Sequence, residues 1–146
     1  MTIDGLSDDK VRSILEDVRS IAVVGFSGSE DKPSHYVAKF LQQKGYRVFP
    51  VNPGLAGQTM LDGPVYGKLS DIPEPVDMVE VFRASEHVGA IVDEALAMSS
   101  KPKVIWMQIG VVNEEAAEKA RAAGIEAVMD RCPKQEIPRL NPSLQG

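Results

Sequence analysis

The sequence lacks the features by which a chain is exported, inserted in a membrane or cross-linked. Cys132 is its single cysteine, which excludes an internal disulfide framework. No apolar run approaches the roughly 20 residues that a bilayer-spanning helix needs. The first five residues have neither the basic nor the apolar segment of a secretory signal. Together these absences predict a soluble protein of the reducing cytoplasm, with no membrane partner.

Basic residues are also in deficit. The chain has 16 Lys and Arg against 21 Asp and Glu, a formal net charge of −5. This balance argues against nucleic acid or an anionic membrane surface as the main partner, so any phosphate site must be local. With 146 residues, of which 43% are hydrophobic, the chain can bury a core without disulfides or metals. We find neither a linker nor an internal repeat, and expect a single domain over residues 1–146 with its core at about 20–140.

The complete signatures of common nucleotide sites are missing. No glycine-rich loop ends in Gly-Lys-Ser or Gly-Lys-Thr, which argues against an ATP-binding P-loop. Gly25 and Gly28 follow an apolar run, but the regular series of three glycines of the dinucleotide fingerprint is absent. The segment at Val51-Asn52-Pro53 has no carboxylate to accept the ribose hydroxyls of a nicotinamide dinucleotide. A nicotinamide-dependent reductase is therefore a weaker alternative.

Apolar runs alternate with segments of helical periodicity along most of the chain. We expect a helix at 7–18 capped by Ser7, and further helices at 34–45, 88–96 and 113–124, the last capped by Asn113. The expected strands are 20–24, 47–51, 76–82, 103–108 and 126–129. Residues 52–75 form a loop with one short extended piece near 65–66, and the proline-containing tail from Arg131 is expected to be irregular. The pattern predicts an α/β fold, a doubly wound Rossmann-like domain with a five-stranded, mainly parallel sheet.

The most informative segment is the buried strand at 20–24 with the glycine turn and helix start that follow it. Glycines let backbone N–H groups approach an anion closely, and helix N-termini favour negative charge. In parallel sheets ligands bind beyond the carboxyl ends of the strands. We therefore expect a phosphate-binding turn at 25–29 and further ligand contacts after the other strands.

Several motifs, in order along the chain, resemble the small stand-alone CoA-binding proteins. Their fold is similar to the N-terminal domain of the succinyl-CoA synthetase α subunit. The resemblance covers about Ser20 to Leu140 and rests on Gly25-Phe26-Ser27 with Pro33 to Val37, Gly45 to Val48, Val51-Asn52-Pro53, Pro75-Val76-Asp77 with Val81-Phe82-Arg83, Trp106 to Gly110, and Met129 to Cys132.

The resemblance implies that coenzyme A, or an acyl-CoA, binds at the C-terminal edge of the sheet. The diphosphate would face the turn, with Ser27 and the backbone as donors and Lys32 and His35 adding positive charge. Residues 51–53 would shape the nucleotide pocket, Phe82-Arg83 would meet adenine or a phosphate, and Gln108 to Gly110 would line the pantetheine path. The site residues are thus Gly25, Phe26, Ser27, Gly28, Lys32, His35, Val51, Asn52, Pro53, Phe82, Arg83, Gln108 and Gly110.

The favoured function is a binding module without chemistry of its own, open to a protein partner or to self-association. Asp77 and Glu80, three positions apart on a strand, point to opposite faces and cannot form an acid/base dyad. The alternative is a CoA-dependent transferase or thiol-redox enzyme that uses Cys132, because a basic neighbour such as Arg131 favours a thiolate. Trp106 is expected to be a core residue rather than a stacking platform.

Overall fold

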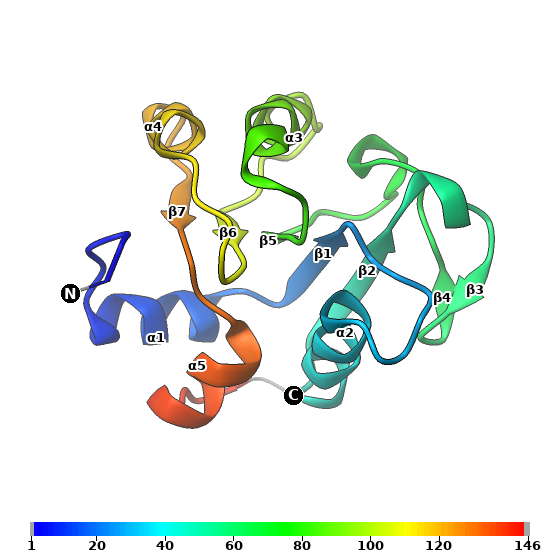
Figure 1. The fold of residues 1–146 in the computed structure, drawn as a ribbon, viewed down its shortest axis with the longest axis horizontal. Helices are drawn as coiled ribbons and strands as arrows, with labels where there is room; N and C mark the ends of the chain where they lie inside the picture. Colours follow the sequence, from blue (N-terminus) through cyan, green and yellow to red (C-terminus); the bar gives the residue numbers. More distant parts are fainter. Residues whose placement is uncertain (1, 145–146) are drawn as a thin grey trace.

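The computed structural model describes residues 2–144, which form a five-stranded parallel sheet between two layers of helices. The strands are β1 (Ser20–Val24), β2 (Arg47–Val51), β5 (Met78–Val81), β6 (Val104–Met107) and β7 (Glu126–Val128), in the spatial order β2-β1-β5-β6-β7. Every pair in this sheet is parallel. The prediction of a doubly wound α/β fold is confirmed (Figure 1).

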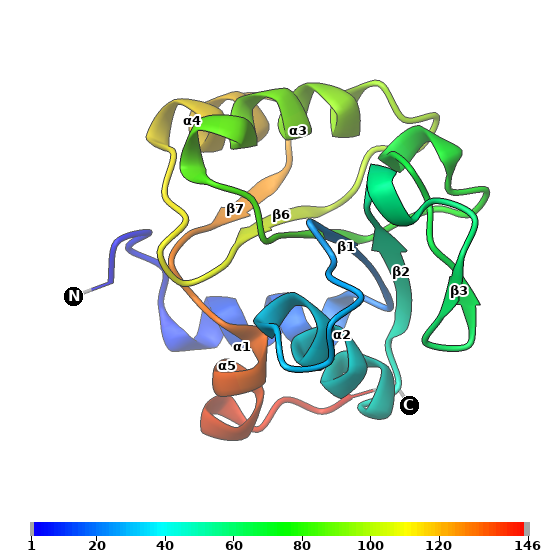
Figure 2. The ribbon, with the colours of Figure 1, turned by 45° about the vertical axis from the view of Figure 1, so that its right-hand side comes forward.

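Two helical layers cover the sheet. One face carries α1 (Asp8–Asp17), α2 (Pro33–Gln43) and α5 (Pro133–Leu140), and the other carries α3 (Val88–Leu96) and α4 (Glu114–Ala122) (Figure 2). The chain goes from β1 through α2 to β2 at one edge, and then returns to add β5 on the other side of β1. This reversal makes the gap between the ends of β1 and β5 a topological switch point, the usual ligand position in such sheets.

Strand alternation explains why β1 is buried throughout. Ile21 and Val23 pack in the layer of α1, α2 and α5, whereas Ala22 and Val24 pack in the layer of α3 and α4. Trp106 is fully buried, and its indole N–H donates to the carbonyl of Arg131 at 2.8 Å, so its predicted core position is confirmed. No helix among residues 2–144 is both long and apolar enough to span a bilayer.

The segment 52–75 contains more structure than its sequence indicates. A short antiparallel hairpin joins β3 (Thr59–Met60) to β4 (Gly63–Pro64), with Leu61 and Asp62 at positive φ. Single 3-10 turns occupy Pro53–Leu55 and Leu69–Asp71. The extended piece predicted near 65–66 is present as a bridge between Tyr66 and Val51. Strands of two residues are too short to show a periodicity, which is why sequence patterns miss this hairpin.

The prediction of an irregular tail was wrong, because residues 133–140 form α5. Pro133 occupies the first turn of the helix, where the N–H that proline lacks would have no partner in any case. Pro138 stands inside the helix, but Ile137 and Leu140 bury their side chains against the core, and Asn141 ends the helix at a φ of +48°. Tertiary packing therefore outweighs the proline penalty.

Candidate functional site

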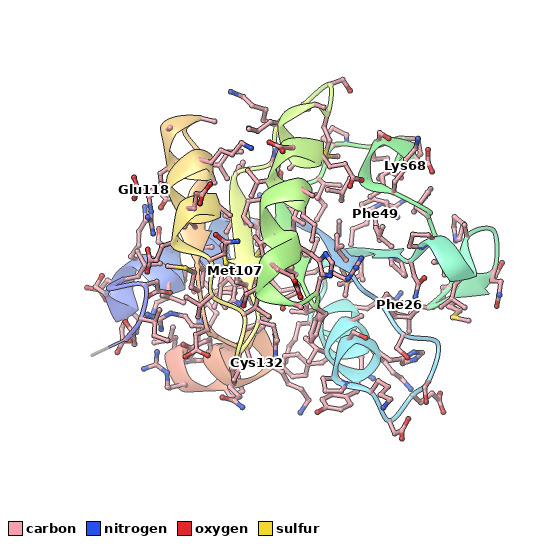
Figure 3. All side chains as sticks on the ribbon, turned by 45° about the horizontal axis from the view of Figure 1, so that its top comes forward. Phe26, Phe49, Lys68, Met107, Glu118 and Cys132 are labelled. Carbon is pink, nitrogen blue, oxygen red and sulfur yellow. The ribbon has the colours of Figure 1, made fainter. Side chains whose placement is uncertain are left out.

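Two cavities open at the carboxyl edge of the sheet, one on either side of the β5 exit. The larger, about 670 Å³, lies between the ends of β5 and β6 and the first turns of α2 and α5. The smaller, about 420 Å³, lies among the ends of β1, β2 and β5 and the turn at Gly67–Leu69. Phe82 and Arg83 line both cavities. Lys68 of the smaller cavity and Cys132 of the larger one lie well apart in Figure 3.

The glycine turn after β1 is closed by protein contacts. The N–H groups of Gly25 and Phe26 both donate to the carbonyl of Val51, at 3.1 and 3.2 Å. The Ser27 N–H donates to Ser34 Oγ at 2.9 Å, and Ser27 Oγ accepts from Ser29 N at 3.1 Å. These N–H groups already donate to protein acceptors. The phosphate-binding turn expected at 25–29 would instead need N–H groups that are free to donate to a diphosphate.

Gly25 is needed for a contact between two strand exits. Its φ is +87°, and a Cβ at this position would lie 2.8 Å from the carbonyl oxygen of Phe82. The close approach that this glycine permits is thus between protein backbones. It brings Phe82-Arg83 next to the end of β1, where the two cavities meet.

Phe26 and His35 pack beneath the glycine turn on its core side. Phe26 is fully buried, and the His35 ring packs against it with ring centroids 5.1 Å apart. His35 Nδ1 lies 2.8 Å from the Ser27 carbonyl, which only accepts, so Nδ1 carries the proton. Both side chains hold the loop in place from the core.

The structure divides the thirteen expected site residues into two groups. Eight line the cavities: Gly25, Val51, Asn52 and Pro53 in the smaller one, Gln108 and Gly110 in the larger one, and Phe82 and Arg83 in both. Five lie outside them: Phe26, Ser27, Gly28, Lys32 and His35. Gly28 lies against Met60 of the hairpin, and Lys32 is an exposed residue at the start of α2.

The smaller cavity has positive charge at its walls. Neither Lys68 nor Arg83 forms an ion pair with any of residues 2–144. Glu94 is the acidic residue of this cavity, and one of its oxygens accepts from the Leu69 N–H at 2.9 Å. Asn52 donates to the Phe26 carbonyl at 2.7 Å and accepts from the Gly54 N–H at 2.8 Å. Two cations without an ion-pair partner among the described residues suit a phosphate group.

The larger cavity is mainly apolar. Two of the residues that line this cavity, Tyr36 and Ile109, are large apolar residues that remain 42% and 48% exposed. Gln108 belongs to the cavity wall, and its buried Oε1 has no hydrogen-bond partner in the described part of the chain. Such a wall suits a ligand segment that is apolar but carries hydrogen-bond donors.

Sequence reasoning missed several of the lining residues. Tyr36 lies in the family motif Pro33 to Val37, but the resemblance implies no ligand contact for it. Lys68 lies in the loop 52–75, which has no periodic pattern. Lys134 and Gln135 reach the cavity because α5 starts there. Ile109 follows β6, so the rule that ligands bind beyond strand ends could have identified it.

Arg131, the basic neighbour that the sequence offered for a thiolate at Cys132, does not line the larger cavity. Its buried guanidinium donates to Asp4 and to Glu136, each at 2.8 Å, and to the Leu6 carbonyl at 3.1 Å. The charge of Arg131 is thus neutralised inside a structural network. It is not available to activate Cys132.

Glu80 is the most unusual ionisable residue of the core. It is fully buried in β5, and both carboxyl oxygens lack a hydrogen-bond partner among residues 2–144. Burial, and then the electrostatic interaction with Cys132, raises the pKa of Glu80 well above 4.5. Asp77 instead accepts a hydrogen bond from the Arg19 N–H at 2.8 Å, so the two carboxyl groups do not share a site.

A parallel sheet with two cavities at its switch point defines a Rossmann-like protein with a candidate nucleotide site. The sequence matches the family described as "CoA binding domain" over residues 19–138. The chain therefore belongs to this CoA-binding family, which confirms the resemblance noted from its motifs.

Relatives of similar length share most of the chain. The protein YneT of Bacillus subtilis is 38% identical over 128 residues, which make up 88% of this chain and 92% of YneT. A solved structure from Thermus thermophilus, described as cell-free ID.343, has 36% identity and a TM-score of 0.86, and the match covers 92% of this chain and 99% of that one.

A larger relative carries a similar segment. The ADP-forming acetate–CoA ligase II of Archaeoglobus fulgidus is 30% identical over 89 residues, which is 60% of this chain but 13% of the ligase. The chain thus corresponds to a small part of that enzyme.

Proposed function

We propose that this protein binds CoA or an acyl-CoA across both cavities, with the nucleotide in the smaller one and the pantetheine arm in the larger one. The observation that carries the proposal is that Phe82 and Arg83 line both cavities, so that one elongated ligand can occupy the two. Each cavity volume, about 420 and 670 Å³, falls in the range of ordinary ligand sites.

The charges of the two cavities support this orientation. CoA has its phosphates at the nucleotide end, and the unpaired cations Lys68 and Arg83 line the smaller cavity. The pantetheine arm has amide N–H donors on an otherwise apolar chain. Gln108 lines the larger cavity together with the apolar groups of Tyr36 and Ile109, and its buried Oε1 is an acceptor without a partner among residues 2–144.

We further propose that the protein acts as a non-catalytic module. No hydrogen-bonded pair of nucleophile and base lines either cavity within residues 2–144. The similarity to a small part of a large ligase suits a module to which another protein, or a second copy of this chain, supplies chemistry. Such a role belongs in the cytoplasm, with the whole chain acting as one domain.

Calorimetry with CoA tests the proposal. Arg83→Gln should weaken CoA binding about 10- to 100-fold, because a hydrogen bond to a charged group contributes about 1.5–3 kcal/mol. Lys39→Gln, at an exposed position of α2 outside both cavities, is the matched control and should leave the affinity unchanged.

Thermal unfolding provides a second readout, because a ligand that binds the native state must stabilise it. Absence of both heat and stabilisation at millimolar CoA would refute the proposal. Competition by NADH at similar concentration would favour the nicotinamide-dependent alternative.

A further inference from the structure

Cys132 lies at the wall of the cavity assigned to the pantetheine arm. It precedes Pro133, the first residue of α5, and 6% of its surface is exposed. Lys134 and Gln135 of the same helix line the cavity with it. The chain's single thiol is thus at the end of the site that would hold the sulfur of CoA.

A second feature of this region points to a ligand. Strand alternation places Glu80 on the same side of the sheet as Phe82 and Cys132, and its carboxyl group is buried without a partner. Gln108, a residue of the cavity wall, also has a buried oxygen, Oε1, without a hydrogen-bond partner among residues 2–144. A buried polar group without a hydrogen bond costs about 1–3 kcal/mol. Glu80 lies close enough to Cys132 to feel its charge, and Gln108 belongs to the same cavity wall as Cys132, so this region has acceptors that a ligand with hydrogen-bond donors could satisfy.

The absence of another cysteine decides what Cys132 can do after oxidation. A mixed disulfide is normally resolved by a second thiol, and the sequence offers none in the same chain. A disulfide between Cys132 and an external thiol would therefore persist until another molecule reduces it.

We propose that Cys132 is a thiol–disulfide exchange site for the sulfur of CoA, an inference that rests on the proposed CoA site. The co-reactant is a CoA disulfide. The Cys132 thiolate attacks one sulfur of this disulfide, a new S–S bond forms between Cys132 and that CoA, and the original S–S bond breaks. The second CoA leaves as a thiolate and takes up the proton that Cys132 released. Cys132 is oxidised and the departing CoA is reduced, so that no other oxidant is needed.

The nucleotide site supplies the selectivity of this reaction. A disulfide held by Lys68 and Arg83 has one sulfur near Cys132, which converts a bimolecular step into one between positioned groups. Glutathione disulfide has the same reacting bond but no nucleotide. The wild-type protein should therefore react with CoA disulfide at least about tenfold faster than with glutathione disulfide.

Mass spectrometry of the denatured protein tests the inference. After treatment with CoA disulfide, the wild-type chain should gain the mass of one CoA, and dithiothreitol should remove it. Cys132→Ser should gain none. Arg83→Gln should react more slowly with CoA disulfide while its reaction with glutathione disulfide stays unchanged.

Calorimetry of the wild-type protein with reduced CoA separates this inference from the proposed function. If reduced CoA binds but the adduct does not form, or forms equally fast with both disulfides, the exchange site is refuted and the binding function stands. If reduced CoA does not bind and neither disulfide is preferred, the binding function itself fails.

Discussion

At the scale of single residues, Gly25 shows how one backbone conformation arranges the site. Its positive φ turns the chain at the end of β1, and the missing side chain lets the Phe82 carbonyl approach. The sequence identified the position correctly but indicated another reason, the approach of an anion. The partner of Gly25 comes from β5, more than fifty residues away, so no local pattern reveals it.

Gly25→Ala should lower the free energy of unfolding by about 3 kcal/mol, because a left-handed backbone and a clash with a backbone oxygen are combined. The matched control is Gly124→Ala. Gly124 has a similar φ of +82° but open space around it, and this change should cost about 1 kcal/mol. Urea unfolding of both variants measures the difference. Equal losses would show that the contact with Phe82 has no energetic role.

At the scale of elements, α5 is the helix on which the larger cavity depends. It positions Cys132 and Lys134, and it is tied to the N-terminal segment by Arg131, which pairs with Asp4 and with Glu136 of α5. Burial raises the pKa of Asp4, but hydrogen bonds from Arg131, Leu6 and Met129 outweigh it, so that the net shift is downward. The pKa of Glu136 is lowered in the same way, by Arg139 and Arg131 against burial.

Arg131→Met should lower the free energy of unfolding by about 3–5 kcal/mol at pH 7, because it removes the buried guanidinium that neutralises Asp4 and leaves Glu136 with Arg139 as its ion-pair partner. Arg121→Met is the control, since the exposed pair of Arg121 with Glu118 contributes at most about 0.5 kcal/mol. Denaturant titrations of both variants give the two values. A loss below 1 kcal/mol for Arg131→Met would contradict the role of this network.

The same network predicts acid sensitivity. Carboxyl groups whose pKa is lowered in the folded state stabilise that state at pH values above their pKa in the unfolded chain, which is 3.8 for Asp4 and 4.5 for Glu136. This stabilisation is lost as the pH falls below about 4, because the folded state then binds protons less readily than the unfolded chain does. The unfolding free energy of Arg131→Met should therefore depend less on pH in this range than that of the wild type.

At the scale of the whole molecule, the strand order joins the two cavities. The reversal at β1 places the β2 exit on one side of β1 and the β5 exit, Phe82-Arg83, on the other, with the β6 exit beyond it. A ligand that spans this edge contacts segments from both halves of the chain.

Hydrogen exchange with fragments of CoA should resolve the two cavities. Adenosine 3′,5′-bisphosphate should slow exchange in residues 52–69, and pantetheine should slow exchange near Gly110 and at the start of α5. CoA should protect both regions in one titration, because the proposed binding mode has a single molecule in both cavities. Protection near α5 by the nucleotide fragment would reverse the proposed orientation.

The sequence by itself determined the family and the alternation of the five strands of the main sheet with the helices α1 to α4. Long apolar runs and capped amphipathic segments, such as the helix that begins after Ser7, can be recognised from the spacing of neighbouring residues alone. It also pointed to Asn52, Arg83 and Gln108, because strand ends can be found along the chain. Tertiary structure alone decided that α5 forms despite its prolines, that the N–H groups of Gly25 and Ser27 are engaged, and that Lys68 and Cys132 line two different cavities at one edge of the sheet. Each of these depends on contacts between segments distant in the sequence, whose energies no local pattern encodes.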